Sequence, residues 1–259
     1  MKMFDLTGKG AVVIGGAGGL GLAVVKGLAE AGARVAIADL RDEDFLKKSA
    51  KEVEDEVGKK VSYYKVDATN EESLGALVAA TAKEFGKVDI LVNAQGINQK
   101  YPGEEFPFDK FMKLFEVNVG SVMLTCKHFG KHMIANKYGK IINISSVRGR
   151  IATRNAGNVG YCGTKGAVDM ITRQFASEYD PHGITVNAIG PAVTETPMMT
   201  EILNQRGPDA RKGYAEGSPL KRMALPTDIV GPVIFLASEA SCFVTGNILY
   251  PDGGLTAVG

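Results

Sequence analysis

The sequence predicts an α/β fold: one domain over residues 1–259, built on a doubly wound parallel sheet of about seven strands. Short β-branched runs alternate with longer amphipathic segments along the whole chain, which is typical of βαβ units. The short runs are almost continuously apolar, as expected of strands that helices cover on both faces. A length of 259 residues suits one hydrophobic core of this type.

The expected elements follow this alternation in order. The candidate strands are Ala11–Ile14, Arg34–Ala38, Val61–Val66, Val88–Val92, Lys140–Ile144, Ile184–Ile189 and Ile248–Tyr250. The candidate helices between them include Leu20–Ala31, Asp42–Val57, Glu71–Phe85 and Val159–Tyr179. The segment Thr194–Leu220 contains scattered proline and glycine and only weak helical patterns, so we expect a lid over a substrate site. The alternative is an ordinary surface loop.

Composition excludes several classes of protein. The formal net charge is +1, so no basic field is available to attract nucleic acid or an anionic membrane. The apolar stretches have the length of strands, so we expect neither a signal peptide nor a membrane-spanning helix. The three cysteines are scattered along the sequence and odd in number, which favours a reduced, cytoplasmic protein.

A glycine-rich turn follows the first expected strand, Gly15-Gly16-Ala17-Gly18-Gly19-Leu20-Gly21. It fits both G-x-x-x-G-x-G and G-x-G-x-x-G. Either spacing lets the backbone approach a pyrophosphate closely, and the helix that follows offers free N–H groups to the anion. Its place between a strand and a helix predicts a dinucleotide cofactor.

The second strand ends at Asp39. A carboxylate there would accept hydrogen bonds from the adenosine ribose and repel a 2′-phosphate, which favours NAD over NADP. Arg41 follows and would weaken this preference if it turned toward a phosphate. The alternative role for Asp39 is a helix N-cap.

Tyr161 and Lys165 place a phenol and an ammonium on one face of an expected helix. Free tyrosine titrates near pH ~10, and a nearby cation lowers that pKa toward the range useful for acid–base catalysis. Ser146 lies at the carboxyl end of the strand that precedes this helix, where parallel sheets bind their ligands. Its hydroxyl is positioned to bind a substrate oxygen on which negative charge develops.

With these motifs in order, the chain resembles the short-chain dehydrogenase/reductase family over nearly its whole length. The motifs are the glycine turn, Asp39, Val66-Asp67, Asn93-Ala94-Gln95-Gly96, Asn118, Ser146, Tyr161 with Lys165, and Asp252-Gly253-Gly254. The resemblance implies a Rossmann fold and an NAD-dependent oxidoreductase that interconverts a secondary alcohol and a ketone. It also implies a homotetramer, packed through Phe111–Ile134 and Val159–Tyr179.

The resemblance further implies the role of each site residue. Tyr161 would transfer the proton, Lys165 would lower its pKa and bind the nicotinamide ribose, Ser146 would polarise the carbonyl, and Asn118 would hold a water beside Lys165. The cofactor would contact Gly15, Gly19, Leu20, Gly21, Asp39, Asp67, Ala68, Asn93, Tyr161, Lys165, Thr194 and Thr196.

The chain departs from the family pattern at a few positions. Ile14 replaces the usual threonine, Asn93-Ala94-Gln95-Gly96 replaces N-N-A-G, and Pro191-Ala192 replaces Pro-Gly. The interval from Ser146 to Tyr161 is also about two residues longer, around Arg154–Val159. We expect these changes to alter the cofactor and substrate pockets and leave the chemistry intact.

The substrate is less constrained. Arg148, Arg150 and Arg154 follow Ser146, and we expect Ser146, Tyr161, Arg148 and Arg154 to contact substrate, with Arg148 binding a carboxylate. The alternative is that the arginines are solvated or face another subunit. Polar loop residues resemble those of sugar-acid and polyol dehydrogenases of the family, gluconate 5-dehydrogenase-like members among them.

Other functions stay open as alternatives: a 3-oxoacyl-carrier-protein reductase, a steroid dehydrogenase, or a non-catalytic dinucleotide-binding module. His128 and His132 have a spacing that suits a metal, but no third ligand is evident in the sequence, so no metal is expected.

Overall fold

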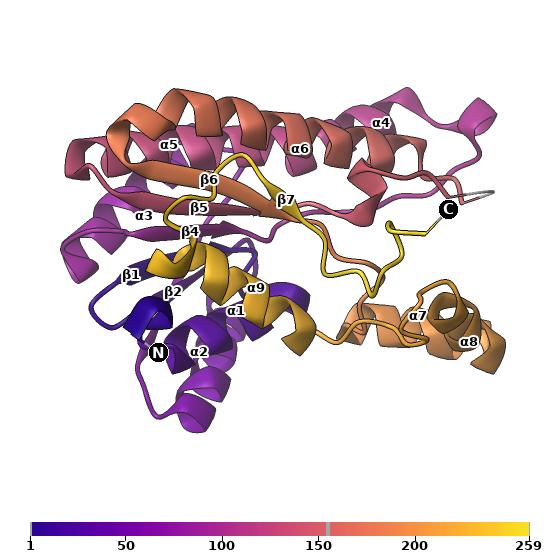
Figure 1. Cartoon of the computed structure of the whole chain (residues 1–259), viewed down its shortest axis with the longest axis horizontal. Coiled ribbons are helices and arrows are strands. Elements are labelled where there is room, and N and C mark those ends of the chain that lie inside the picture. The colour runs from indigo at the N-terminus through magenta and orange to yellow at the C-terminus, as the bar shows by residue number, and fades with distance from the viewer. Residues whose placement is uncertain (1, 154–155, 259) are drawn as a thin grey trace.

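A computed structural model describes residues 2–153 and 156–258, and in them a parallel sheet crosses the molecule (Figure 1). Within those residues the sheet has seven strands in the order β3-β2-β1-β4-β5-β6-β7. The strands are β1 (Gly10–Ile14), β2 (Arg34–Asp39), β3 (Val61–Lys65), β4 (Ile90–Asn93), β5 (Gly139–Ile144), β6 (Ile184–Ile189) and β7 (Ile248–Leu249). The order reverses between β1 and β4, which creates a ligand-binding crevice at their carboxyl ends. The predicted doubly wound fold is confirmed.

Helices cover both faces of the sheet (Figure 1). One face carries α1 (Gly19–Glu30), α2 (Glu43–Val57) and α9 (Thr227–Ala237), and the other carries α3 (Glu71–Phe85), α5 (Ser121–Asn136) and α6 (Val159–Tyr179). Alternate residues of each strand point to opposite faces. In β1, Val13 therefore packs in the core beneath α1, while Val12 and Ile14 pack in the core beneath α5 and α6.

The expected boundaries of several elements differ from those observed. Val88 precedes β4, which begins at Ile90, and β7 ends at Leu249, one residue before Tyr250. The segment expected to pack across a two-fold axis, Phe111–Ile134, is interrupted. It comprises part of α4 (Phe108–Phe115), a π-helical turn over Glu116–Gly120, and most of α5. The sequence pattern could not predict this interruption, because one π-helical turn shifts the spacing of the hydrophobic residues by only one position.

The excursion after β6 contains two helices, α7 (Pro197–Arg206) and α8 (Pro208–Glu216), which lie at one end of the sheet (Figure 1). The start of the excursion pairs with the chain just beyond its end, and its end is attached to the C-terminal segment. Thr194 pairs with Ala224 in an isolated parallel bridge, and the Ser218 hydroxyl donates to the Gly253 carbonyl at 3.0 Å.

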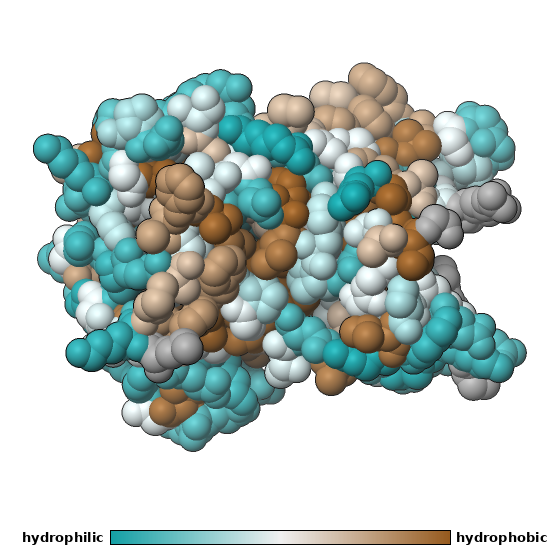
Figure 2. Space-filling view, viewed as in Figure 1, coloured by the Kyte–Doolittle hydropathy of each residue, from teal (hydrophilic) through white to brown (hydrophobic). Residues whose placement is uncertain are grey.

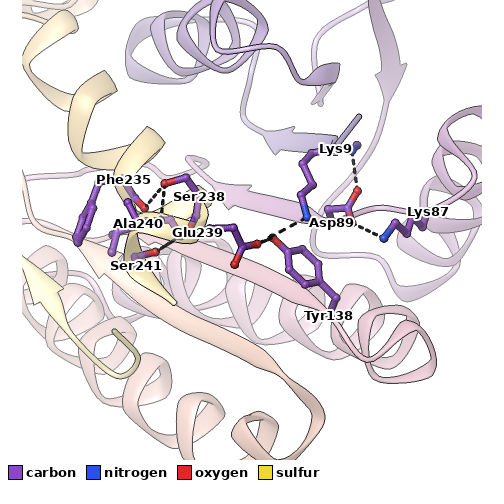
Figure 3. Close-up of polar contacts among 11 residues, drawn as sticks. Lys9, Lys87, Asp89, Tyr138, Phe235, Ser238, Glu239, Ala240 and Ser241 are labelled. Carbon is purple, nitrogen blue, oxygen red and sulfur yellow. Dashed lines mark hydrogen bonds and ion pairs between the residues drawn. The ribbon is translucent and has the colours of Figure 1, made fainter. Parts of the chain in front are cut away.

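A cluster of charged and polar residues lies at the opposite end of the sheet, where the strands begin (Figure 3). Asp89 accepts a hydrogen bond from the Gly10 amide at 2.9 Å and pairs with Lys87 at 3.1 Å. Tyr138 donates to Glu239 at 2.9 Å, and the Lys9 ammonium lies 3.7 Å from the centroid of the Tyr138 ring. These contacts link β1, β4 and the segments around Tyr138 and Glu239 at the end of the sheet away from the crevice.

Apolar side chains also reach the surface. Figure 2 shows them gathered over α9 and β7 on the face in view, and Phe243 and Leu249 are among the exposed hydrophobic residues. Within residues 2–153 and 156–258, no helix combines the length and apolarity needed to span a bilayer.

Candidate active site

The glycine turn forms a tight cradle between β1 and α1. A Cβ at Gly21 would lie 2.0 Å from the carbonyl oxygen of Gly15, and a Cβ at Gly15 would lie 2.7 Å from the amide nitrogen of Gln95. Gly15 also has a φ of 72°, a left-handed conformation that a side chain disfavours. The turn therefore requires glycine at both positions for its own packing.

The outer part of the same turn is open. A Cβ at Gly18 would meet no atom within 4 Å, and Gly18 caps α1 without a side-chain hydrogen bond. The first N–H groups of α1 are thus free to bind an anion such as a pyrophosphate. A Cβ at Gly19 would lie 3.6 Å from Thr196, so the start of α7 borders this opening. The cradle fits the dinucleotide that the sequence predicts.

Asp39 lies at the carboxyl end of β2, beside the cradle. Its Oδ2 accepts from the Ala17 amide and its Oδ1 from the Arg41 amide, both at 3.2 Å. The N-cap of α2 is Asp42, whose side chain accepts from Phe45, so the alternative role of Asp39 as a helix cap is wrong. The Arg41 guanidinium lies 4.8 Å from the Phe45 ring centroid and is exposed.

Three further residues predicted to contact the cofactor, Asp67, Ala68 and Asn93, differ in exposure. Asp67 is exposed after β3, and Thr69 donates to it through both its amide and its hydroxyl, which lowers the pKa of the Asp67 carboxyl. Ala68 packs at the edge of the core. Asn93 is 1% exposed, and its Nδ2 donates to Asn143 at 2.8 Å. The Asn93 side chain thus faces the core, and direct binding of cofactor by this amide stays a prediction.

Asn118 lies in the π-helical turn and is fully buried. Its Oδ1 accepts from the Ile97 amide at 2.8 Å, and its Nδ2 donates to the Ile97 carbonyl at 2.9 Å and to Thr164 at 3.1 Å. The loop after β4 is thereby attached to α6. The departure at Gln95 is accommodated in the same region, because its Nε2 donates to Ser121 at 2.9 Å.

Ser146 lies at the carboxyl end of β5, and its hydroxyl interacts with the Tyr161 phenol so as to lower the pKa of that phenol. Ser146 is 8% exposed, and its Oγ also accepts from the Arg148 amide at 3.1 Å. Burial raises the pKa of Tyr161, while the Ser146 hydroxyl and the charge of Arg148 lower it. The site therefore holds a half-buried phenol whose anion has two stabilising neighbours.

Lys165 lies one helical turn after Tyr161 and is 5% exposed. Its ammonium donates to the Ile144 carbonyl at 2.8 Å and lies 5.6 Å from the centroid of the Tyr161 ring. Burial lowers the pKa of Lys165 to about 8, and the charge of Asp169 opposes this shift. A Cβ at Gly96 would lie 3.8 Å from this ammonium, so the loop that Asn118 holds also borders Lys165.

The arginines after Ser146 occupy different places. Arg148 donates to the Ala152 carbonyl at 3.1 Å, and its charge lowers the pKa of Tyr161. Arg150 is turned to the Tyr250 ring, 5.4 Å from its centroid. Arg154 lies outside the described residues, and its predicted contact with substrate stays a prediction.

The remaining cofactor positions lie where the excursion begins. Thr194 is 7% exposed and donates to the Ala192 carbonyl at 3.0 Å. The Thr196 hydroxyl accepts from the Met199 amide at 3.2 Å and caps α7. Leu20 packs against the core at the start of α1. Thr196 therefore lies close to the glycine cradle, although the two segments are far apart in sequence.

The sequence reasoning missed Asp169. This carboxylate is 4% exposed and lies one further turn along α6, on the face that carries Tyr161 and Lys165. The same i, i+4 spacing that identified the first pair could have identified it. The histidines have other partners: His128 contacts Glu71 at 3.2 Å, and His132 accepts from the Val88 amide at 3.1 Å. Among residues 2–153 and 156–258, no three His, Cys, Asp or Glu side chains could hold a metal ion.

Together, the Rossmann sheet, the cradle at its crevice and the Ser–Tyr–Lys group beside it define the class of nicotinamide-dependent oxidoreductases. A family model described as Enoyl-(Acyl carrier protein) reductase matches residues 15–256. The chain belongs to the short-chain dehydrogenase/reductase family, and the resemblance in its motifs is confirmed.

Its relatives include dehydrogenases of sugar acids. The chain is 34% identical to a 2-dehydro-3-deoxy-D-gluconate 5-dehydrogenase of Formosa agariphila over 257 residues, which cover 99% of this chain and 96% of the relative. It is 35% identical to a gluconate 5-dehydrogenase of Gluconobacter oxydans over 254 residues, covering 98% and 97%.

A solved structure is similarly close. The crystal structure of a gluconate 5-dehydrogenase from Burkholderia cenocepacia in complex with NADP and tartrate has a TM-score of 0.92 and 33% identity, covering 100% of this chain and 99% of that one. The prediction of a gluconate 5-dehydrogenase-like member of the family is confirmed by these relatives.

Proposed function

We propose that this protein interconverts a secondary alcohol and a ketone on a sugar acid or polyol, with NAD as the cofactor and Tyr161 as the proton-transferring residue. The observation that carries the proposal is the half-buried Tyr161 phenol beside two groups: Ser146, whose hydroxyl lowers the pKa of the phenol, and the Lys165 ammonium, 5.6 Å from the centroid of the ring. The bound nicotinamide would supply or accept the hydride.

The chain's own residues perform the proton chemistry. In reduction, Ser146 and Tyr161 donate hydrogen bonds to the carbonyl oxygen, and Tyr161 then gives up its proton as the alcohol forms. In oxidation the Tyr161 phenolate takes the proton of the alcohol. The Arg148 charge favours that phenolate, and the Arg148 amide fixes the Ser146 hydroxyl. The Lys165 ammonium, 5.6 Å from the centroid of the Tyr161 ring, would favour the phenolate as well when it is charged. Asn118 holds the loop after β4 beside Lys165.

Asp39 supports NAD as the cofactor. Its carboxylate is held beside the cradle by two backbone amides, where it would accept the ribose hydroxyls and repel a 2′-phosphate. NADP is the second candidate, because a related gluconate 5-dehydrogenase is described in complex with NADP and Arg41 is exposed near the same strand end.

Arg148 supports an acidic, hydroxylated substrate. Its charge acts on the reacting phenol, and a planar guanidinium binds a carboxylate through two hydrogen bonds. Two relatives are named as dehydrogenases of gluconate or a deoxy-ketogluconate. The steroid and 3-oxoacyl alternatives would lack a partner for this charge.

The excursion over residues 194–220 would act as the lid, because it starts beside the cradle and is attached at both ends. We also propose a homotetramer, for which exposed Met112, Met123 and Met170 on α4, α5 and α6 offer apolar contacts. A cytoplasmic location agrees with three unpaired cysteines. Light scattering and cell fractionation test these two proposals.

The function is tested by following reduced nicotinamide with a panel of sugar acids and polyols. Tyr161→Phe removes only the hydroxyl and should lower kcat by at least about 100-fold, the scale of general acid–base catalysis. Tyr179→Phe is the matched control, because its hydroxyl, on the same helix, contacts the Cys126 carbonyl away from the site. Equal activity of Tyr161→Phe and the parent would refute the proposed role of the phenol.

A further inference from the structure

We infer that Asp169 is a positioning residue that keeps Lys165 protonated, so that three side chains on one face of α6, and not two, control the acidity of the phenol. The inference rests on the proposed function, since the charge of Lys165 matters to catalysis only if Tyr161 transfers the proton. It adds a residue that the resemblance in sequence motifs did not include.

The three side chains follow one another along the helix. Tyr161, Lys165 and Asp169 are at positions i, i+4 and i+8 of α6, so each lies one turn from the next. Lys165 and Asp169 are 5% and 4% exposed, and each is too buried for water to solvate it fully. A buried ammonium needs an anion nearby, and Asp169 is the acid, among the described residues, whose charge acts on it.

The Asp169 carboxylate is fixed by residues from two other segments. The Ser145 hydroxyl donates to Oδ1, and the Tyr250 hydroxyl donates to Oδ2 at 3.3 Å. Gly149 packs so closely that a Cβ there would lie 2.6 Å from Oδ2. Ser145 immediately precedes Ser146, so the carboxylate is attached to the same strand end that presents the reacting hydroxyl.

The pKa shifts of Lys165 and Asp169 agree with this arrangement. Burial lowers the pKa of Lys165 to about 8, and Asp169 raises it. Burial raises the pKa of Asp169, whereas Ser145, Tyr250, Arg173 and Lys165 lower it. Without the Asp169 carboxylate, the lowering of the Lys165 pKa by burial would no longer be offset. The lysine would then lose its proton at a lower pH.

Other charged groups surround Tyr161, Lys165 and Asp169. Arg173 lies one turn beyond Asp169 on α6 and is exposed. Arg150 stacks over the Tyr250 ring from the loop after Ser146, and its charge acts on the Tyr250 phenol. Arg148 acts on Tyr161. All three are cations, so none replaces Asp169 as a counter-charge for Lys165.

The decisive variant is Asp169→Asn, which keeps the shape of the side chain and its ability to hydrogen-bond Ser145 and Tyr250 but removes the charge. The first measurement uses the protein without cofactor. The rate of acetylation of Lys165 by acetic anhydride is followed against pH by mass spectrometry, because only the neutral amine reacts. The parent midpoint should lie near 8, and in Asp169→Asn it should fall by about one pH unit or more.

The second measurement is the pH profile of kcat/KM for oxidation. Loss of the Lys165 charge weakens the stabilisation of the phenolate, so the alkaline limb should move down with the lysine. A midpoint that moves from about 8 to about 7 lowers activity about fivefold at pH 8 and less than about 1.2-fold at pH 6. A residue that only supports the fold would lower the rate equally at both pH values.

Two control variants separate charge from structure. Asp89→Asn removes another buried carboxylate at the far edge of the sheet (Figure 3) and should leave both midpoints unchanged. Tyr250→Phe removes a contact of Asp169 but keeps its charge, and it should also retain the midpoints. If Asp169→Asn does not fold, Asp169→Ala carries the same expectation.

A parent-like Lys165 midpoint in Asp169→Asn, or an equal shift in Asp89→Asn, would overturn the inference. Failure of the proposed function looks different: Tyr161→Phe would then match the parent in activity, while the acetylation midpoint of Lys165 would still report on Asp169.

Discussion

The side-chain amide of Asn118 binds both backbone groups of Ile97, accepting from its N–H at 2.8 Å and donating to its carbonyl at 2.9 Å. This pairing resembles one rung of a sheet, made by a side chain from a helix. It is possible because the π-helical turn over Glu116–Gly120 directs a fully buried amide toward the loop. One side chain therefore binds both backbone groups of Ile97 in the loop that borders Lys165.

Asn118→Ala should release that loop. Two partly buried backbone groups of Ile97 would lose their partner, which costs up to about 1–3 kcal/mol each where water does not replace it. We expect a lower free energy of unfolding in urea, faster hydrogen exchange over residues 96–101, and a kcat reduced about 10-fold or more. Asn136→Ala is the control, because its exposed side chain hydrogen-bonds to His132, away from the loop after β4. Parent-like exchange and kcat in Asn118→Ala would contradict this role.

Asp39→Ala should change the preference between cofactors. Removal of the carboxylate takes away two hydrogen-bond acceptors for the ribose and the repulsion of a 2′-phosphate. The ratio of kcat/KM for NAD to that for NADP should fall about 10- to 100-fold, equivalent to roughly 1.4–2.8 kcal/mol. Arg41→Ala in the same background tests whether the arginine binds the phosphate. A ratio that does not change in Asp39→Ala would count against NAD selection by this residue.

The two parts of the glycine turn should respond differently to alanine. Gly21→Ala places a Cβ 2.0 Å from the Gly15 carbonyl oxygen, so the protein should lose stability even without cofactor. Gly18→Ala meets no protein atom within 4 Å and should keep the parent melting temperature while binding NAD more weakly. Calorimetry with and without NAD distinguishes the two effects.

Gly75→Ala is the control for both glycine variants. It lies inside α3 with nothing within 4 Å of the added Cβ, and it should stabilise the protein by about 0.5–1 kcal/mol. Unchanged affinity for NAD in Gly18→Ala would show that the opening is not the anion site.

Arg148→Ala should have two separable effects. On a carboxylate substrate it should raise KM by about 10-fold or more, while a neutral polyol should be much less affected.

Because the Arg148 charge lowers the pKa of Tyr161, its loss should also raise that pKa. The ascending limb of the pH profile for oxidation should then move to higher pH, even with the neutral polyol. Arg148→Lys keeps a positive charge, so its pH profile should stay near that of the parent. Its affinity for the carboxylate substrate should still be lower, because lysine lacks the planar guanidinium. Equal losses on both substrates would end the carboxylate hypothesis.

Local sequence patterns predicted much of the secondary structure. The helix predicted over Val159–Tyr179 has those bounds in the structure, and so does the strand Ile184–Ile189. Such elements are predictable because hydrophobic periodicity and backbone hydrogen bonding act over a few neighbouring residues. The same locality made the Tyr161–Lys165 pair visible, since its spacing is set by one helical turn.

Contacts between distant segments could not be found in this way. Thr196 lies against Gly19, and the Tyr250 hydroxyl reaches Asp169, because the sheet order brings the ends of separate strands together. The π-helical turn that directs Asn118 inward is likewise a result of packing between α5 and α6 and the loop after β4.

The sequence by itself determined the alternation of strands and helices, the glycine turn and the order of the reactive residues, because these depend on local geometry and on the polarity of successive side chains. The tertiary structure decided which of those residues share a buried space. Burial sets the pKa values of Tyr161, Lys165 and Asp169, and burial depends on the packing of segments far apart in the chain.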